Sequence, residues 1–195
     1  MDEFAAKLAS LGFELPKWQL PPSEALVVEF EKSFSLSLPT DYRGFLVKYG
    51  GFWSGDGAVC PCLEPTPCGD SAFIETFYGF TEPIRSDNIM DATKMIDGYP
   101  DVIAIGDNIL GGMLWLKCTG NDAGYVYMFD NQYRSNWPDE QFVEMFPNLA
   151  PAISQYLELR RKGKLPSKPK GYEHVYLVAK SFTQFMSRLE AGAST

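Results

Sequence analysis

The chain has 195 residues, of which 45% are hydrophobic and 14% aromatic, so one packed core can bury most of its apolar surface without a second domain. Its 25 acidic and 17 basic side chains give a formal net charge of −8, which opposes non-specific binding to nucleic acid and to anionic membranes. The charge favours basic partners, although solubility alone is an alternative reason for it.

The sequence also indicates a compartment. Its acidic N-terminus differs from a signal peptide, and no apolar run reaches the ~18 residues of a membrane helix. Four cysteines are too few and too clustered for a secreted disulfide scaffold. We therefore expect a cytoplasmic protein with reduced thiols.

Residues 1–21 are predicted to form a short helix and a linker, because apolar side chains with helical spacing precede Pro16 and Pro21. A second helix is predicted after Pro22, with Ser23 as its N-cap and an acidic first turn.

The segment 38–51 contains the start, the buried face and the stop of a third helix. Thr40 or Asp41 can cap the free amides of its first turn. Gly50 and Gly51 supply a left-handed stop. The apolar stripe consists of Tyr42, Phe45, Leu46 and Tyr49. This pattern predicts a helix packed on the core.

Residues 54–70 are rich in Gly, Pro and Cys, which predicts a long exposed loop, and such loops are often binding surfaces. A strand is predicted over 73–80. A helix is then predicted to open at Ser86 and Asp87 and to end at Gly98.

Three short apolar segments, at 102–108, 113–118 and 125–130, are separated by glycine-rich turns. Strand, turn, strand, turn and strand within about thirty residues predict an antiparallel meander.

The C-terminal part is predicted to begin with a helix over 151–162. A basic, proline-containing arm follows over 160–170, and a strand is predicted over 175–178. A helix over 181–189, capped by Ser181, closes the chain.

The chemistry of the sequence restricts the enzyme classes. A single histidine, His174, excludes sites that need two or more, including HExxH zinc proteases and facial-triad iron sites. Pairing of His174 with a nucleophilic cysteine stays an alternative, but nothing local marks a thiol as activated. A zinc site is a second alternative, with Cys118 or His174 completing three loop cysteines: Cys60, Cys62 and Cys68. We expect no catalytic residue, no metal and no cofactor.

Five side chains are the candidate partner-binding residues. Trp53, Tyr133 and Trp137 lie among Gly, Asn, Ser and Pro, where an aromatic ring is suited to anchor a protein interface. The alternative for each ring is a place in the core. Asp56 and Asp70 lie in the predicted loop and are the exposed acids of the set.

Four separated pieces of the chain, taken in order, resemble the SUKH superfamily, which is named after the yeast cell-wall assembly regulator Smi/Knr. They are Leu38-Pro39-x-Asp41-Tyr42-x-x-Phe45-Leu46 with Gly50-Gly51, Ile103-x-Ile105-Gly106-Asp107 with Gly111-Gly112, Gly124-x-Val126-Tyr127 before Asp130, and Ser181-Phe182-x-x-Phe185.

The resemblance implies an α+β domain with a central, mostly antiparallel sheet packed by helices over residues 22–190, followed by a tail at 191–195. It implies no reaction. Family members characteristically bind proteins: many bacterial ones resemble immunity proteins that neutralise polymorphic toxins, often nucleases, and eukaryotic ones act as regulatory or scaffolding modules. We expect a non-enzymatic domain that binds a cognate toxin with a basic surface, with the regulatory module as the alternative. Insertions at 54–70 and 160–170 depart from the compact family type.

Overall fold

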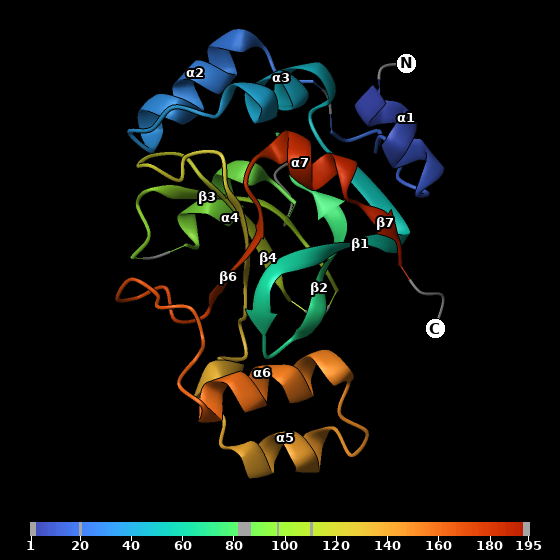
Figure 1. Cartoon of the computed structure of the whole chain (residues 1–195). Coiled ribbons are helices and arrows are strands. Elements are labelled where there is room, and N and C mark those ends of the chain that lie inside the picture. Colours follow the sequence, from blue (N-terminus) through green and yellow to red (C-terminus); the bar gives the residue numbers. More distant parts are fainter. Residues whose placement is uncertain (1–2, 20, 82–86, 97, 110, 193–195) are drawn as a thin grey trace.

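The computed structural model describes residues 3–19, 21–81, 87–96, 98–109 and 111–192. Within these residues, seven α-helices, one 3₁₀ helix and seven strands form an α+β domain, as expected (Figure 1). All neighbouring strands of the sheet are antiparallel, in the order β6-β5-β4-β3-β2-β1-β7.

The helices are α1 (Glu3–Ser10), α2 (Glu24–Ser33), α3 (Thr40–Tyr49), α4 (Ile89–Lys94), the 3₁₀ helix η1 (Arg134–Asn136), α5 (Asp139–Met145), α6 (Pro151–Arg161) and α7 (Phe182–Ser187). The strands are β1 (Phe52–Thr66), β2 (Gly69–Phe77), β3 (Val102–Asp107), β4 (Met113–Lys117), β5 (Val126–Phe129), β6 (Val175–Ala179) and β7 (Glu190–Ala191).

Strands β1 to β6 follow one another across the sheet in chain order, which confirms the predicted meander. The short strand β7 pairs with the outer edge of β1. The sheet curls until β6 approaches β1, where Glu64 of β1 accepts a hydrogen bond from the Leu177 amide of β6 at 2.5 Å. Curling leaves less of the β1 edge open than a flat sheet would.

The core lies between the sheet and the layer formed by α1, α2, α3 and α7, and it continues to buried side chains of α5 and α6 (Figure 1). Phe45 of α3 is at its centre, with ring centroids 4.9 Å from Phe182 of α7 and 5.7 Å from Phe77 of β2. Burying each such ring stabilises the fold by about 1.5–3 kcal/mol, so the predicted apolar stripe of α3 is a main contributor to stability.

Asp41 binds a free amide in the first turn of α3, as predicted, although Pro39 occupies the N-cap position itself. Asp41 Oδ1 accepts a hydrogen bond from the Tyr42 amide at 2.9 Å. Its Oδ2 also reaches α7, where it accepts hydrogen bonds from the Thr183 amide at 2.9 Å and the Thr183 hydroxyl at 3.0 Å. Its negative charge is favourable at the N-terminus of α7, so one carboxylate serves the first turns of both helices.

The predicted loop at 54–70 is also wrong, because these residues form most of the β1–β2 hairpin. Alternation places Ala58 and Cys60 in the core, both fully buried. The strand register shifts before Ala58, where Gly57 has a φ of 66°, and again after Pro61. Bulges absorb the glycines and prolines that suggested a loop.

Helices α5 and α6 form a layer at the opposite end of the molecule from α1–α3 (Figure 1). Helix α6 lies against β1 and β2, where the sequence predicted a helix. Neither α5 nor β7 was predicted. Helix α5 buries a single side chain, Phe142, so it carries almost no amphipathic signal.

The helix expected from Ser86 differs at its start. Ser86 lies outside the described residues, and α4 begins at Ile89. Asn88 is its N-cap, with a side chain that accepts a hydrogen bond from the Met90 amide at 2.9 Å. The cap is of the expected chemical type but occurs two residues later.

Candidate functional site

Two of the predicted contact residues, Trp53 and Asp56, lie at the start of β1. This segment pairs with the chain that follows α1, since the Glu14 amide donates to the Trp53 carbonyl at 2.7 Å and the reverse bond measures 3.0 Å. The Trp53 side chain is nevertheless 47% exposed, and Asp56 is exposed. Backbone pairing therefore fixes the strand and leaves an indole and a carboxylate at the surface.

Strand β7 brings another acid to the same region, because Glu190 pairs with Val59 of β1. We call the exposed residues here the Trp53 surface; they are Glu14, Leu15, Trp53, Asp56 and Glu190. The surface lies on the side of the molecule that carries α1 and β7 (Figure 1). It combines three carboxylates with two large apolar groups, a composition suited to a basic protein surface.

A buried carboxylate shapes the turn between β5 and η1. Asp130 is 2% exposed, and its Oδ2 accepts a hydrogen bond from the Arg134 amide at 2.6 Å. Its Oδ1 accepts bonds from the Gln132 amide at 3.2 Å and the Arg134 guanidinium at 2.9 Å. The charged hydrogen bonds offset the cost of burying Asp130 and fix the path of the turn.

Tyr133 lies at the tip of this turn with φ 53° and ψ 38°, in the left-handed region. This conformation costs about 1–2 kcal/mol for a residue with a Cβ. Its ring is 49% exposed and stands edge-on to His174, with centroids 4.6 Å apart. The Asp130 turn thus holds the exposed ring of Tyr133 in a fixed position.

Trp137 is half-buried, and its ring serves mainly to pack η1 on α5. Its ring centroid is 5.3 Å from that of Phe142, and the Arg134 guanidinium lies 5.7 Å above it.

Asp70 is exposed at the closed end of the β1–β2 hairpin. Cys68, in the same turn, accepts a hydrogen bond from Arg134 at 3.4 Å. Arg134 therefore links the hairpin end to η1, and Asp70 lies at the same end of the molecule as Tyr133. The structure thus separates the predicted residues into two groups, because the Trp53 surface lies at the open end of the hairpin.

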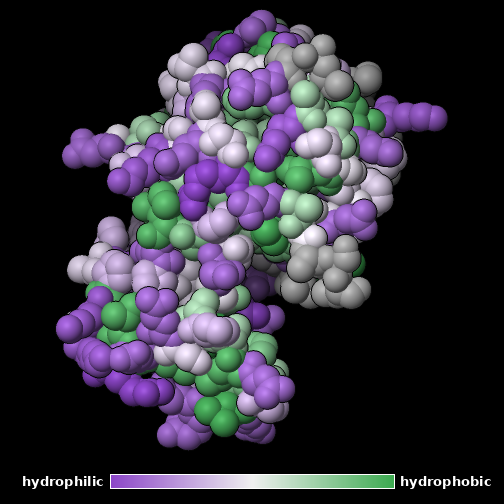
Figure 2. Space-filling model, turned by 45° about the vertical axis from the view of Figure 1, so that its right-hand side comes forward, coloured by the Kyte–Doolittle hydropathy of each residue, from purple (hydrophilic) through white to green (hydrophobic). Residues whose placement is uncertain are grey.

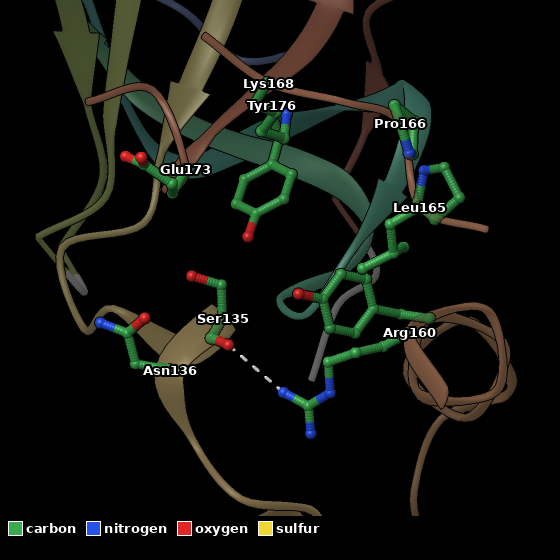
Figure 3. A pocket seen from close by; sticks show the side chains of 10 residues that line it. Ser135, Asn136, Arg160, Leu165, Pro166, Lys168, Glu173 and Tyr176 are labelled. Carbon is green, nitrogen blue, oxygen red and sulfur yellow. Dashed lines mark hydrogen bonds between the residues drawn. The ribbon is translucent and has the colours of Figure 1, made fainter. Parts of the chain in front are cut away.

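A cavity of about 350 Å³ opens between η1, α6 and the segment that leads into β6 (Figure 3). Leu165 and two prolines give it apolar walls, while Ser135 and Asn136 face it from η1. The hydroxyl of Tyr176 points into the space, and the Arg160 guanidinium donates to the Ser135 carbonyl at 3.3 Å at its lower side (Figure 3).

The cysteine chemistry that the sequence left as an alternative gains no support from the structure. All four cysteines are free. Burial raises the pKa of Cys60 to about 11 and those of Cys62, Cys68 and Cys118 to about 12. His174 Nδ1 pairs with the Ser135 hydroxyl at 2.7 Å. Within the described ranges, no group of three or more His, Cys, Asp or Glu side chains is placed to hold a metal ion.

Sequence reasoning did not identify the residues that build the cavity. Tyr156 and Arg160 carried only the helical spacing of α6, and Tyr176 lies within a short strand pattern. No pattern in the sequence pointed to Ser135. These residues meet through tertiary structure, and no local pattern in the sequence pointed to the cavity.

Helices packed on a curled antiparallel meander define an α+β domain. The chain belongs to the SMI1/KNR4 family (SUKH-1), whose family model matches residues 21–188. This family comprises immunity proteins and Smi/Knr-type modules that generally bind partner proteins and are generally non-catalytic. A search of curated proteins finds no match. Each helix within the described residues is too short or too polar to span a bilayer.

Proposed function

We propose that this protein is a non-catalytic immunity protein that binds a cognate toxin with a basic surface and neutralises it in the cytoplasm. The observation that carries the proposal is the Trp53 surface, where an exposed indole and exposed carboxylates lie on paired segments of the chain. Family membership supports partner binding, and the Trp53 surface supports a basic partner.

Charge and apolar contact contribute differently to such binding. The net charge of −8 attracts a positively charged protein and raises the rate of encounter. Trp53 then supplies the contact energy, since replacing a central interface tryptophan by alanine commonly weakens binding by about 2 kcal/mol or more. Around η1, by contrast, acids alternate with bases such as Arg160, Arg161 and Lys162, which gives this end less attraction for a basic partner.

Inhibition by such a surface needs area and no catalytic group. A stable inhibitory interface buries on the order of 1,600 Å² in total. The apolar residues on the face seen in Figure 2 form several separate patches and no continuous area, so a partner on that face would meet a largely polar surface. The proposal therefore rests on an aromatic anchor within a polar surround, as in most non-obligate complexes.

Co-expression with the toxic domain encoded next to this protein tests the proposal. We expect the wild type to restore growth and to co-purify with the toxin in a stoichiometric complex. A double variant, Trp53→Ala with Asp56→Lys, should lose both properties. The matched control is Val143→Ala with Glu140→Lys, which changes one exposed apolar side chain and one exposed acid on α5, and it should behave as wild type.

Two results would count against the proposal. Failure of the wild type to protect against any neighbouring toxin candidate would remove the immunity role. A pull-down that recovers signalling or housekeeping proteins and no toxin would favour the regulatory module, the other role known in this family.

A further inference from the structure

The proline-containing segment 164–170, which leads from α6 towards β6, has a burial pattern that repeats every three residues (Figure 1). Leu165 and Lys168 are partly buried and line the cavity beside η1, whereas the other residues of the segment are exposed (Figure 3). A polyproline II helix has three residues per turn, so this period places Leu165 and Lys168 on one edge of such a helix. A β-strand would give a period of two.

The sequence of the segment restricts it to the same conformation. Pro166 and Pro169 have a φ fixed at about −65°, and each disfavours the helical region for the residue before it. Among the described residues, no backbone–backbone hydrogen bond involves residues 165–168. A polyproline II helix needs no such bond, because its backbone is hydrated.

Lys168 fixes the buried edge of the segment to the sheet. Its Nζ donates hydrogen bonds to Glu64 Oε1 of β1 and to the Val175 carbonyl of β6, both at 2.6 Å. The same ammonium lies 4.6 Å from the ring centroid of Tyr176. These contacts hold the segment in place before a partner binds, so binding costs less conformational entropy than it would for a free peptide.

The other two edges of the segment face solvent. Pro166 and Pro169 form an apolar edge, although Pro166 also borders the cavity. Lys164 and Lys170 lie on the third edge and make it cationic. Glu173, which is exposed, lies near Lys170 and offsets part of its charge. The free surface of the segment therefore combines two proline rings with two lysine side chains.

We propose that the segment 164–170 is a ligand for a polyproline-binding domain, whose groove is lined by aromatic rings and bordered by acidic side chains. Such grooves, as in SH3, WW and EVH1 domains, bind prolines in polyproline II conformation, and SH3 ligands commonly have the spacing of Pro166 and Pro169. An acidic border attracts the two lysines. The segment contacts β1 at Glu64, near the closed end of the β1–β2 hairpin, whereas Trp53 lies at the open end. The inference is therefore independent of the proposed function.

NMR titration of the full ¹⁵N-labelled chain tests the inference, with purified SH3, WW and EVH1 domains as separate probes. We expect saturable binding of at least one domain, with the largest shifts at the amides of residues 164–170. Pro166→Ala with Pro169→Ala should weaken this binding by at least about tenfold, because both apolar contacts are lost. The matched control is Pro100→Ala with Pro147→Ala, which replaces two exposed prolines outside the segment and should bind as the wild type does.

A second double variant tests the charge. Lys164→Glu with Lys170→Glu should also weaken binding, and its difference from the wild type should shrink as salt rises. Thermal unfolding shows whether each variant is folded. Should the double proline variant be less stable than the wild type, the single variants Pro166→Ala and Pro169→Ala replace it, and each should bind more weakly than the wild type.

Three results would overturn the inference. The first is that none of the three domains binds the folded wild type. The second is that the largest shifts lie outside residues 164–170. The third is that the lysine variant loses binding while the proline variants keep it, which would show attraction of an anionic surface to a basic segment and no recognition of a polyproline II helix.

Discussion

Asp41 of α3 and Thr183 of α7 are joined by two hydrogen bonds, although they lie 142 residues apart. The carboxylate accepts from the Thr183 amide at 2.9 Å and from its hydroxyl at 3.0 Å. Helices α3 and α7, each of which is predicted from its own local sequence pattern, are thereby held in one layer above the sheet.

Removing this link should destabilise the fold. Asp41→Ala is expected to lower the free energy of unfolding by about 1–2 kcal/mol, because it leaves the Thr183 amide of α7 without its acceptor and removes a favourable charge. Urea denaturation measures the change. Asp91→Ala is the control, since it also removes an acid from the first turn of a helix and breaks an exposed ion pair with Lys94, but breaks no bond between helices, and it should cost less than about 0.5 kcal/mol. Equal losses in both variants would contradict a special role for Asp41.

The turn that positions Tyr133 should depend on the charge of Asp130. Asp130→Asn replaces a buried acceptor of three hydrogen bonds by an amide, and we expect a loss of about 2–4 kcal/mol in unfolding free energy. Asp70→Asn changes an exposed carboxylate at the same end of the molecule and should have almost no effect. If the two variants are equally stable, the Asp130 network does not hold the turn.

The pairing of α5 with α6 should weaken in acid. Hydrogen bonds from Arg160 and then from Arg161 lower the pKa of Asp139 below its ordinary value of 3.8. A lowered pKa in the folded state gives stability that is complete above pH 3.8 and is lost as the pH falls through the folded pKa. Asp139→Asn removes the titrating carboxyl, so the stability lost between pH 5 and pH 2 should be smaller than in the wild type by about the amount this pair contributes. Thermal unfolding at a series of pH values in this range measures the loss. A variant with the wild-type acid slope would contradict this assignment.

The thiols should react slowly in the native protein. Burial raises the pKa of Cys62 and Cys68 to about 12, so almost no thiolate is present at neutral pH. At pH 7.5, iodoacetamide should modify the folded chain at least about a hundredfold more slowly than the chain in urea. Mass spectrometry counts the modified thiols. A cysteine that is alkylated rapidly at pH 6 would revive the cysteine-enzyme alternative.

Local signals predicted part of the fold well. The helix of Phe45 has its apolar stripe and its glycine stop within a few residues, and the helix of Phe182 has its stripe next to the Ser181 cap. The strands of the meander are separated by turns that contain glycine. The β1–β2 hairpin was missed because Gly57 and Pro61, which suggest a loop, lie beside or within its register shifts. The amino-acid composition shows the glycines and prolines of this segment but does not show that a β-bulge accommodates them.

The candidate site was predicted only in part, for a related reason. An exposed aromatic among turn residues is visible in sequence, and Trp53 and Tyr133 are indeed about half exposed. The cavity is not visible in this way, because Ser135, Arg160 and Tyr176 come from three separate elements. The way these side chains meet depends on tertiary structure, which no local pattern encodes.

The most direct test of the central claim is the binding of the purified chain to its neighbouring toxin domain, measured at low and at physiological salt. We predict a 1:1 complex whose association rate falls as salt rises, and at least about a tenfold loss of affinity in Trp53→Ala. A toxin domain that forms no complex with the wild type, or that binds Trp53→Ala and the wild type equally well, would contradict the account.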